Sequence, residues 1–133
     1  MLYPYPHPSS SPLPPPEQVL EENRLAYIGL RDIDPEEGAM LRASNVHVYT
    51  MRDVDKHGIA RVIEMAIEAV GPSLDCPLHL SLDIDSVDPQ LAPGTGTAAR
   101  GGLTYREIHY ICEELALTQV RSGWSVRTAS RLV

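Results

Sequence analysis

The residues best suited to chemistry lie in the segment Leu78–Pro89, where Asp83 and Asp85 stand two positions apart at the end of a short apolar run. Because side chains alternate between the two faces of a strand, His79, Ser81 and the two aspartates are expected on one face. Carboxylates that face a protein core are costly unless a cation compensates them. A divalent cation with oxygen ligands does this most simply. The pair therefore predicts half of a metal site.

Two other interpretations of this segment remain open. A turn whose acids cap backbone N–H groups explains Asp88, which precedes Pro89, but it explains two inward-facing carboxylates poorly. The Asp-x-Asp-x-Val pattern also fits haloacid-dehalogenase-type phosphatases, in which Asp83 is a nucleophile beside Mg²⁺. Such enzymes need a later acidic pair, and nothing after Glu114 supplies one. A phosphatase is therefore the second hypothesis.

Further candidate residues lie in two other segments. Asp34, followed by Pro35 and with Glu37 three positions on, is typical of a helix start, and spacing alone favours capping over ligand binding. The glycine-rich stretch 93–102 is a weak phosphate cradle because it lacks a Walker lysine. Its glycines nevertheless allow close approach of a ligand, where Thr97 offers a hydroxyl. None of the five histidines has ligand spacing with another, so no metal histidine is predicted.

Strands that alternate with helices must position these residues. The hydrophobic patterns predict strands over 24–30, 46–49 and 78–84, helices over 35–43, 59–70 and from 104 onward, and loops over 51–58 and 86–102. This order predicts an α/β fold, with a parallel sheet and helices on both of its faces. Ligands bind beyond the carboxyl ends of such strands. The Asp34 turn and the Asp83–Asp85 pair are therefore expected to face one crevice.

Composition sets limits on the chain's organisation and partners. The 133 residues suffice for one modest domain with an aliphatic core, since Phe is absent. We expect a proline-rich disordered arm over 1–20, a partial α/β domain over 21–118 and a divergent tail over 119–133 without a convincing strand. The net charge of −7, without a basic stripe, argues against nucleic acid.

Targeting features and cysteines limit the compartment. No secretory signal or membrane-spanning apolar run is apparent in this sequence. Cys76 and Cys112 lack metal or disulfide spacing, and we expect free thiols in a reducing compartment. A cytoplasmic location is therefore predicted, with mitochondria left open.

Several segments together resemble the ureohydrolase family, and its arginase members most closely. The resemblance extends over about 24–118 and is carried by the sequences AYIGLRDIDP at 26–35, DKHGI at 55–59, HLSLDIDSVDP at 79–89, APGTGT at 92–97 and GGLTYRE at 101–107. The combination of the Ser-x-Asp-x-Asp-x-x-Asp-Pro block with the Thr-Gly-Thr and Gly-Gly-Leu-Thr-x-Arg-Glu segments is highly specific. The resemblance implies a partial three-layer α/β/α domain.

The resemblance also implies a chemistry. Arginases hydrolyse the guanidinium group of L-arginine to ornithine and urea, in arginine metabolism and the urea cycle, with a hydroxide bridging two Mn²⁺ ions. By resemblance, Asp83 and Asp85 match two manganese ligands. Asp34 and Glu37 match acids that bind the substrate's α-amino group, and Thr97 matches a threonine of the substrate pocket. Agmatinase, which uses the same metal acids, is the nearest alternative, but the segment from Arg31 to Glu37 favours arginase.

Departures from the family pattern lower the activity expected of this chain. No Asp-x-His-x-Asp motif, which supplies further metal ligands in the family, is present, and neither is the late Glu-Val-Asn-Pro motif that holds the guanidinium. The chain therefore resembles an arginase truncated at both ends, and we expect it to be poorly active alone. A third hypothesis is a non-catalytic partial subunit. Complete family members are expected to be homo-oligomers, as trimers or hexamers.

Overall fold

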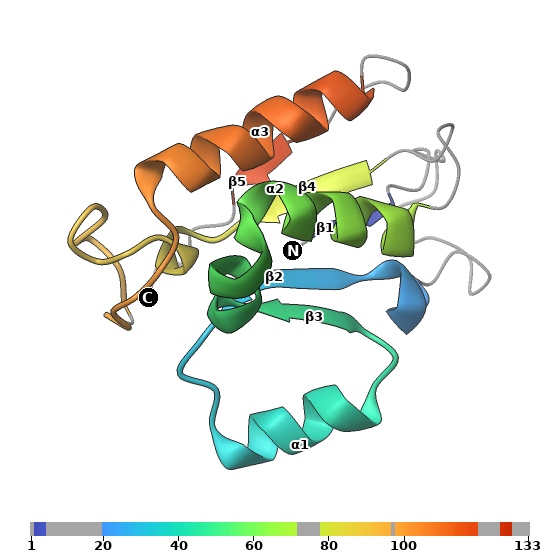
Figure 1. Cartoon of the computed structure of the whole chain (residues 1–133). Helices are drawn as coiled ribbons and strands as arrows, with labels where there is room; N and C mark the ends of the chain where they lie inside the picture. The colour runs from blue at the N-terminus through green and yellow to red at the C-terminus, as the bar shows by residue number, and fades with distance from the viewer. Residues whose placement is uncertain (1, 5–19, 72–77, 97, 120–125, 129–133) are drawn as a thin grey trace, which may run out of the picture.

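A five-stranded mixed sheet forms the centre of the molecule in the computed structural model, which describes residues 2–4, 20–71, 78–96, 98–119 and 126–128. Its strand order is β3-β2-β1-β4-β5 (Figure 1). The strands are β1 (Leu2–Pro4), β2 (Ala26–Leu30), β3 (His47–Thr50), β4 (Leu78–Leu82) and β5 (Val126–Thr128). β2 pairs with β3 and β4 pairs with β5 in parallel, whereas β1 is antiparallel to both β2 and β4.

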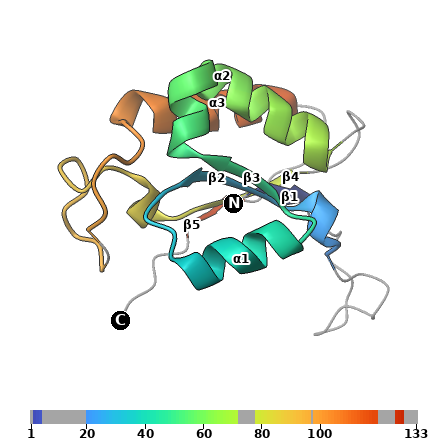
Figure 2. The same cartoon turned by 60° about the horizontal axis from the view of Figure 1, so that its bottom comes forward.

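Helices cover both faces of this sheet. The α-helices are α1 (Pro35–Ala43), α2 (Met51–Val70) and α3 (Tyr105–Gln119), and two short 3₁₀ helices are η2 (Glu22–Arg24) and η3 (Ile84–Ser86). α2 and α3 lie together on one face, and α1 lies on the other (Figure 2). The predicted α/β class with helices on both faces is therefore confirmed. No helix within the described ranges is long and apolar enough to cross a membrane.

The core lies mainly between the sheet and the inner faces of α2 and α3. It is aliphatic, as composition predicted, and its buried members are Ala26, Val54, Val62, Ile63, Ala66, Val70, Leu78, Leu80, Leu103, Ile111 and Leu115. Apolar residues at intervals of three and four give the part of α2 from 62 to 70 one buried stripe. Cys112, which was predicted to be a free thiol, is free and exposed on α3, and Cys76 lies outside the described residues.

Capping residues set the starts of the helices. Asp34 accepts a hydrogen bond from the Glu37 N–H at 2.8 Å and caps α1. Thr104 and Glu107 form a capping box at the start of α3, the helix predicted from 104 onward, with the Thr104 N–H donating to Glu107 Oε2 at 2.7 Å. These two starts were predicted because their signals are local in the sequence.

The segment 51–58 was predicted as a loop and is helical instead. Asp53 Oδ2 accepts hydrogen bonds from both the N–H and the hydroxyl of Thr50, which starts α2 at Met51. The segment 51–58 contains few apolar side chains, and only Val54 is buried in it. Gly58, with φ of 77° and ψ of 153°, then interrupts the helical geometry before the apolar stripe begins.

Three further expectations require correction. Leu2–Pro4 was predicted within a disordered arm and forms β1, while 5–19 lie outside the described residues. Val126–Thr128 forms β5, although no convincing strand was predicted there. The third predicted strand ends at Leu82, and Ile84–Ser86 turns into η3 instead of continuing it. The sheet is mixed because β1 runs antiparallel to β2 and β4. β1 and β5 were not predicted because a strand of three residues carries no usable periodicity.

Candidate functional site

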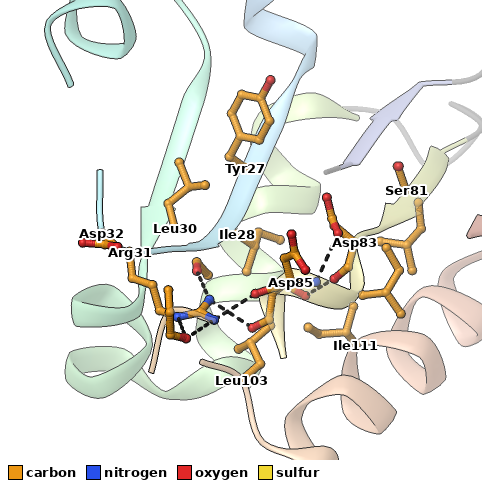
Figure 3. Close-up of a pocket in the computed structure, with 15 residues that line it drawn as sticks. Tyr27, Ile28, Leu30, Arg31, Asp32, Ser81, Asp83, Asp85, Leu103 and Ile111 are labelled. Atoms are coloured by element: carbon orange, nitrogen blue, oxygen red, sulfur yellow. Dashed lines mark hydrogen bonds between the residues drawn. The ribbon is translucent and has the colours of Figure 1, made fainter. Parts of the chain in front are cut away.

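A pocket of about 360 Å³ lies at the carboxyl ends of β2 and β4. The two strands supply its apolar sides, and the loops that follow them supply its polar edge (Figure 3). Leu103 and Ile111 close it from the direction of α3. Its acidic lining residues are Asp32, Asp83 and Asp85. The position agrees with the general rule that ligands bind beyond the carboxyl ends of parallel strands.

Asp83 and Asp85 both line this pocket, but they do not lie on a buried strand face. Asp83 is exposed and its Oδ1 accepts a hydrogen bond from the Asp85 N–H at 3.1 Å, so it caps η3. Asp85 is half-buried. The predicted strand alternation fails here because β4 ends at Leu82. The 3₁₀ turn nevertheless brings both carboxylates to one pocket (Figure 3).

The carboxylates of Asp83 and Asp85 suit a hard or borderline cation, since Mn²⁺ and Mg²⁺ prefer oxygen ligands. Two carboxylates are fewer than a pair of metal ions needs. Within the described ranges, no group of three or more His, Cys, Asp or Glu side chains is arranged to hold a metal ion. The donor chemistry therefore fits manganese, whereas the number of donors fits only part of a binuclear site.

The predicted substrate-binding residues are not in this pocket. Asp34 and Glu37 are exposed at the start of α1, and neither lines the pocket, so the expected single crevice is not formed by the Asp34 turn. Asp32, from the same loop, lines the pocket instead, with φ of 52°, a left-handed conformation that Asp tolerates. Thr97 lies outside the described residues.

Arg31 is the main site residue that sequence reasoning missed. Its guanidinium donates to the carbonyl oxygens of Ala99 at 2.7 Å, Asp85 at 2.8 Å and Ser86 at 3.2 Å. Backbone acceptors leave no signature in a sequence, which explains the omission. An arginine directly after an apolar strand that ends at the ligand-binding edge was the only available signal.

Asp88 joins the loop after β4 to the glycine-rich loop. Its Oδ1 accepts from the Gln90 N–H at 2.9 Å, and its Oδ2 accepts from the N–H groups of Gly101 and Gly102 at 2.8 Å and 3.2 Å. These bonds to Gln90, Gly101 and Gly102, with the nearby Arg31 charge, lower the pKa of the Asp88 carboxyl below its usual value. The capping interpretation of Asp88 is therefore confirmed.

Comparison with known proteins defines the class. The fold is a partial α/β domain with an acidic pocket at the strand ends, and the Arginase family model matches residues 5–124. The chain therefore belongs to the arginase family. An arginase of Schizosaccharomyces pombe is 58% identical over 101 residues, covering 76% of this chain and 31% of that protein. An arginase of Neurospora crassa is 52% identical over 98 residues, covering 74% and 27%.

Solved structures agree with this assignment. Arginase from Bacillus caldovelox superimposes with a TM-score of 0.72 at 38% identity, covering 84% of this chain and 37% of that one. A cold-adapted arginase from Glaciozyma antarctica superimposes with a TM-score of 0.64 at 46% identity, covering 76% of this chain and 34% of that one. A hypothetical agmatinase from Burkholderia thailandensis gives 0.59 at 28% identity, covering 72% and 28%. The chain thus spans about a third of the length of the relatives it matches.

Proposed function

We propose that this chain carries part of the active site of an arginase, in which the complete protein cleaves the guanidinium group of L-arginine to ornithine and urea. In this proposal Asp83 and Asp85 each supply oxygen ligands to a binuclear manganese centre. Manganese, when bound, supplies a hydroxide nucleophile because it lowers the pKa of water. The observation that carries the proposal is that both carboxylates line one pocket at the strand ends.

The substrate contacts belong to the proposal as well. Asp34 and Glu37 would bind the α-ammonium group of arginine, as the resemblance to the family implies, by a charge attraction that solvent weakens because both carboxylates are exposed outside the pocket. Thr97 would line the substrate pocket. The names of the relatives favour arginine over agmatine, because curated relatives that are 58% and 52% identical to this chain are arginases. We further propose a cytoplasmic homo-oligomer, either a trimer or a hexamer, as the complete protein.

Manganese titration tests the metal role. Mn²⁺ is paramagnetic, so the NMR signals of the Asp83 and Asp85 amides should broaden at lower Mn²⁺ concentrations than that of Asp55, an exposed acid on α2. The double variant Asp83→Asn, Asp85→Asn should lose this selectivity, because an amide is a poor substitute for an anionic ligand. The matched variant Asp55→Asn should keep it. Equal broadening at all exposed acids would contradict the metal role.

A urea-release assay tests the state of the isolated chain. We expect little urea from L-arginine in the presence of Mn²⁺, because Asp83 and Asp85 leave each metal short of ligands. Agmatine serves as the alternative substrate, and a chromogenic phosphate ester tests the phosphatase hypothesis. Robust urea release from L-arginine would overturn the expectation of a poorly active partial unit. Preferential turnover of agmatine would overturn the choice of substrate.

The non-catalytic hypothesis treats this chain, which spans about a third of the length of its relatives, as a partial subunit. A partial subunit should associate with a complete arginase. Co-expression of this chain with the S. pombe relative, followed by size-exclusion chromatography, would test it. Elution of the two chains in separate peaks would count against a partial subunit.

A further inference from the structure

The guanidinium of Arg31 lies where three loops meet: the loop after β2, the turn that contains η3, and the end of the glycine-rich loop. Its Nε and Nη2 donate to the Ala99 carbonyl oxygen at 3.1 Å and 2.7 Å. Nη2 also donates to the Asp85 carbonyl at 2.8 Å, and Nη1 donates to the Ser86 carbonyl at 3.2 Å (Figure 3). One side chain thus joins segments 54 and 68 residues away along the chain.

This arrangement uses the particular geometry of arginine. A guanidinium is planar, carries five N–H donors in a fixed fork and stays charged at all relevant pH values. The acceptors of Arg31 that the structure shows are backbone carbonyls, with Val87 and Gly29 at the longer distances of 3.4 Å and 3.5 Å. A lysine ammonium is a single point of charge and cannot reach carbonyls on two loops with the same geometry.

The glycine-rich loop is shaped to admit this guanidinium. A Cβ atom at Gly102 would lie 2.7 Å from Arg31 Nη2 and 2.6 Å from the Asp88 nitrogen, so any larger residue would displace one of them. Two backbone hydrogen bonds also join these loops. The Leu103 N–H donates to the Ser86 carbonyl oxygen at 2.9 Å, and the Asp88 N–H donates to the Leu103 carbonyl oxygen at 3.0 Å. The loop after β4 and the glycine-rich loop are therefore held together on both sides of Arg31.

We propose that Arg31 is a positioning residue that fixes η3, so that the carboxylates of Asp83 and Asp85 are held together at the pocket. The contact is direct, because the Asp85 peptide carbonyl is itself an acceptor of Arg31. Asp83 in turn is oriented by its bond from the Asp85 N–H. The metal consequence rests on the proposed function, whereas the junction of the loops does not.

Hydrogen exchange and Mn²⁺ titration of two variants test this role. Arg31→Ala and Arg31→Lys should speed amide exchange at Ser86, Val87 and Leu103 by roughly ten-fold or more, while the α2 core amides of Val62 and Ile63 keep their rates. In the same variants the Mn²⁺ concentration that broadens the Asp83 and Asp85 signals should rise by about 10- to 100-fold, as for other groups that orient metal ligands.

A matched control and a chemical rescue separate positioning from general stability. Arg106→Ala removes an exposed arginine of α3 that pairs with Glu113 at 3.4 Å, and it should change neither measurement. Millimolar ethylguanidinium should restore slow exchange at Ser86 and Val87 in Arg31→Ala, whereas ethylammonium should not. Arg31→Lys provides the test if Arg31→Ala does not fold.

The possible failures are distinguishable. Exchange that is unchanged at Ser86, Val87 and Leu103, or that rises equally at Val62 and Ile63, would overturn the positioning role. The positioning role would also be overturned if Mn²⁺ binds selectively to the wild type and the Mn²⁺ concentration that broadens the Asp83 and Asp85 signals is the same in the Arg31 variants. If the wild type shows no selective Mn²⁺ broadening while local exchange still responds to Arg31, the metal function fails and the loop junction stands.

Discussion

At the scale of single residues, Asp88 is important for what its charge does to the backbone. Its carboxylate accepts hydrogen bonds from three backbone N–H groups, one in its own turn and two in the glycine-rich loop. Asp83 makes a similar but more local bond to the Asp85 N–H. Aspartates of the same short segment thus divide two tasks, since Asp88 joins loops while Asp83 and Asp85 face the pocket.

The lowered pKa of Asp88 predicts a loss of stability in acid. A carboxyl whose pKa is lower in the folded chain than in the unfolded chain, where it is about 3.9, stabilises the fold above that value. The contribution is lost as the pH falls through the folded-state pKa. Asp88→Asn should therefore lower the free energy of unfolding at pH 7 and weaken its decline below about pH 4.

Urea unfolding followed by circular dichroism at pH 7, 5 and 3 measures both effects of Asp88→Asn. Asp55→Asn, an exposed acid on α2, is the matched control and should leave the unfolding free energy at pH 7 nearly unchanged. An Asp88→Asn variant with the wild-type dependence on pH would show that the carboxylate bonds to Gly101 and Gly102 contribute nothing to folding.

At the scale of elements, local signals predicted more than long-range ones. The starts of α1 and α3 were predicted because Asp34 and Thr104 carry their capping signals within three residues. β1 was missed, since three residues that pair with distant strands leave no periodicity. The site was predicted in part: Asp83 and Asp85 do share a pocket, but Arg31 acts through carbonyls that no side-chain pattern reveals.

Helix α2 contains a second feature that no periodicity indicated. Gly58 has φ of 77° and ψ of 153°, a region that is nearly confined to glycine. No atom lies within 4 Å of a Cβ built there, so Gly58→Ala creates backbone strain without a clash. We expect the free energy of unfolding to fall by about 1–3 kcal/mol.

Gly38→Ala in α1 is the matched control for Gly58→Ala. The new Cβ would meet the flexible end of Arg42 at 3.2 Å, and Gly38 has no positive φ. Because alanine is the better helix former, this variant should gain about 0.5–1 kcal/mol once Arg42 moves aside. Thermal unfolding of both variants measures the difference, and changes of the same sign would refute the strain assigned to Gly58.

At the scale of the whole molecule, one aliphatic core supports the sheet and the pocket together. Leu103 belongs to that core and also lines the pocket, and its Cδ1 would lie 3.2 Å from a Cβ at Gly29. Ile111 has the same double role from α3. The geometry of the pocket is therefore coupled to core packing, and a loss of packing in the core should change the positions of the pocket residues.

A core truncation tests that coupling. Ile63 of α2 is fully buried, and Ile63→Ala should lower the free energy of unfolding by about 2–5 kcal/mol, a large share of the roughly 5–15 kcal/mol typical of a domain. Met40→Ala is the control, because that side chain is 73% exposed on α1 and its loss should change stability by less than about 0.5 kcal/mol. Urea unfolding measures both variants. Ile63 does not line the pocket. Faster amide exchange at Leu103 in Ile63→Ala would therefore reveal the coupling. Unchanged exchange there would show that the pocket is held by its own loop contacts through Arg31 and Asp88.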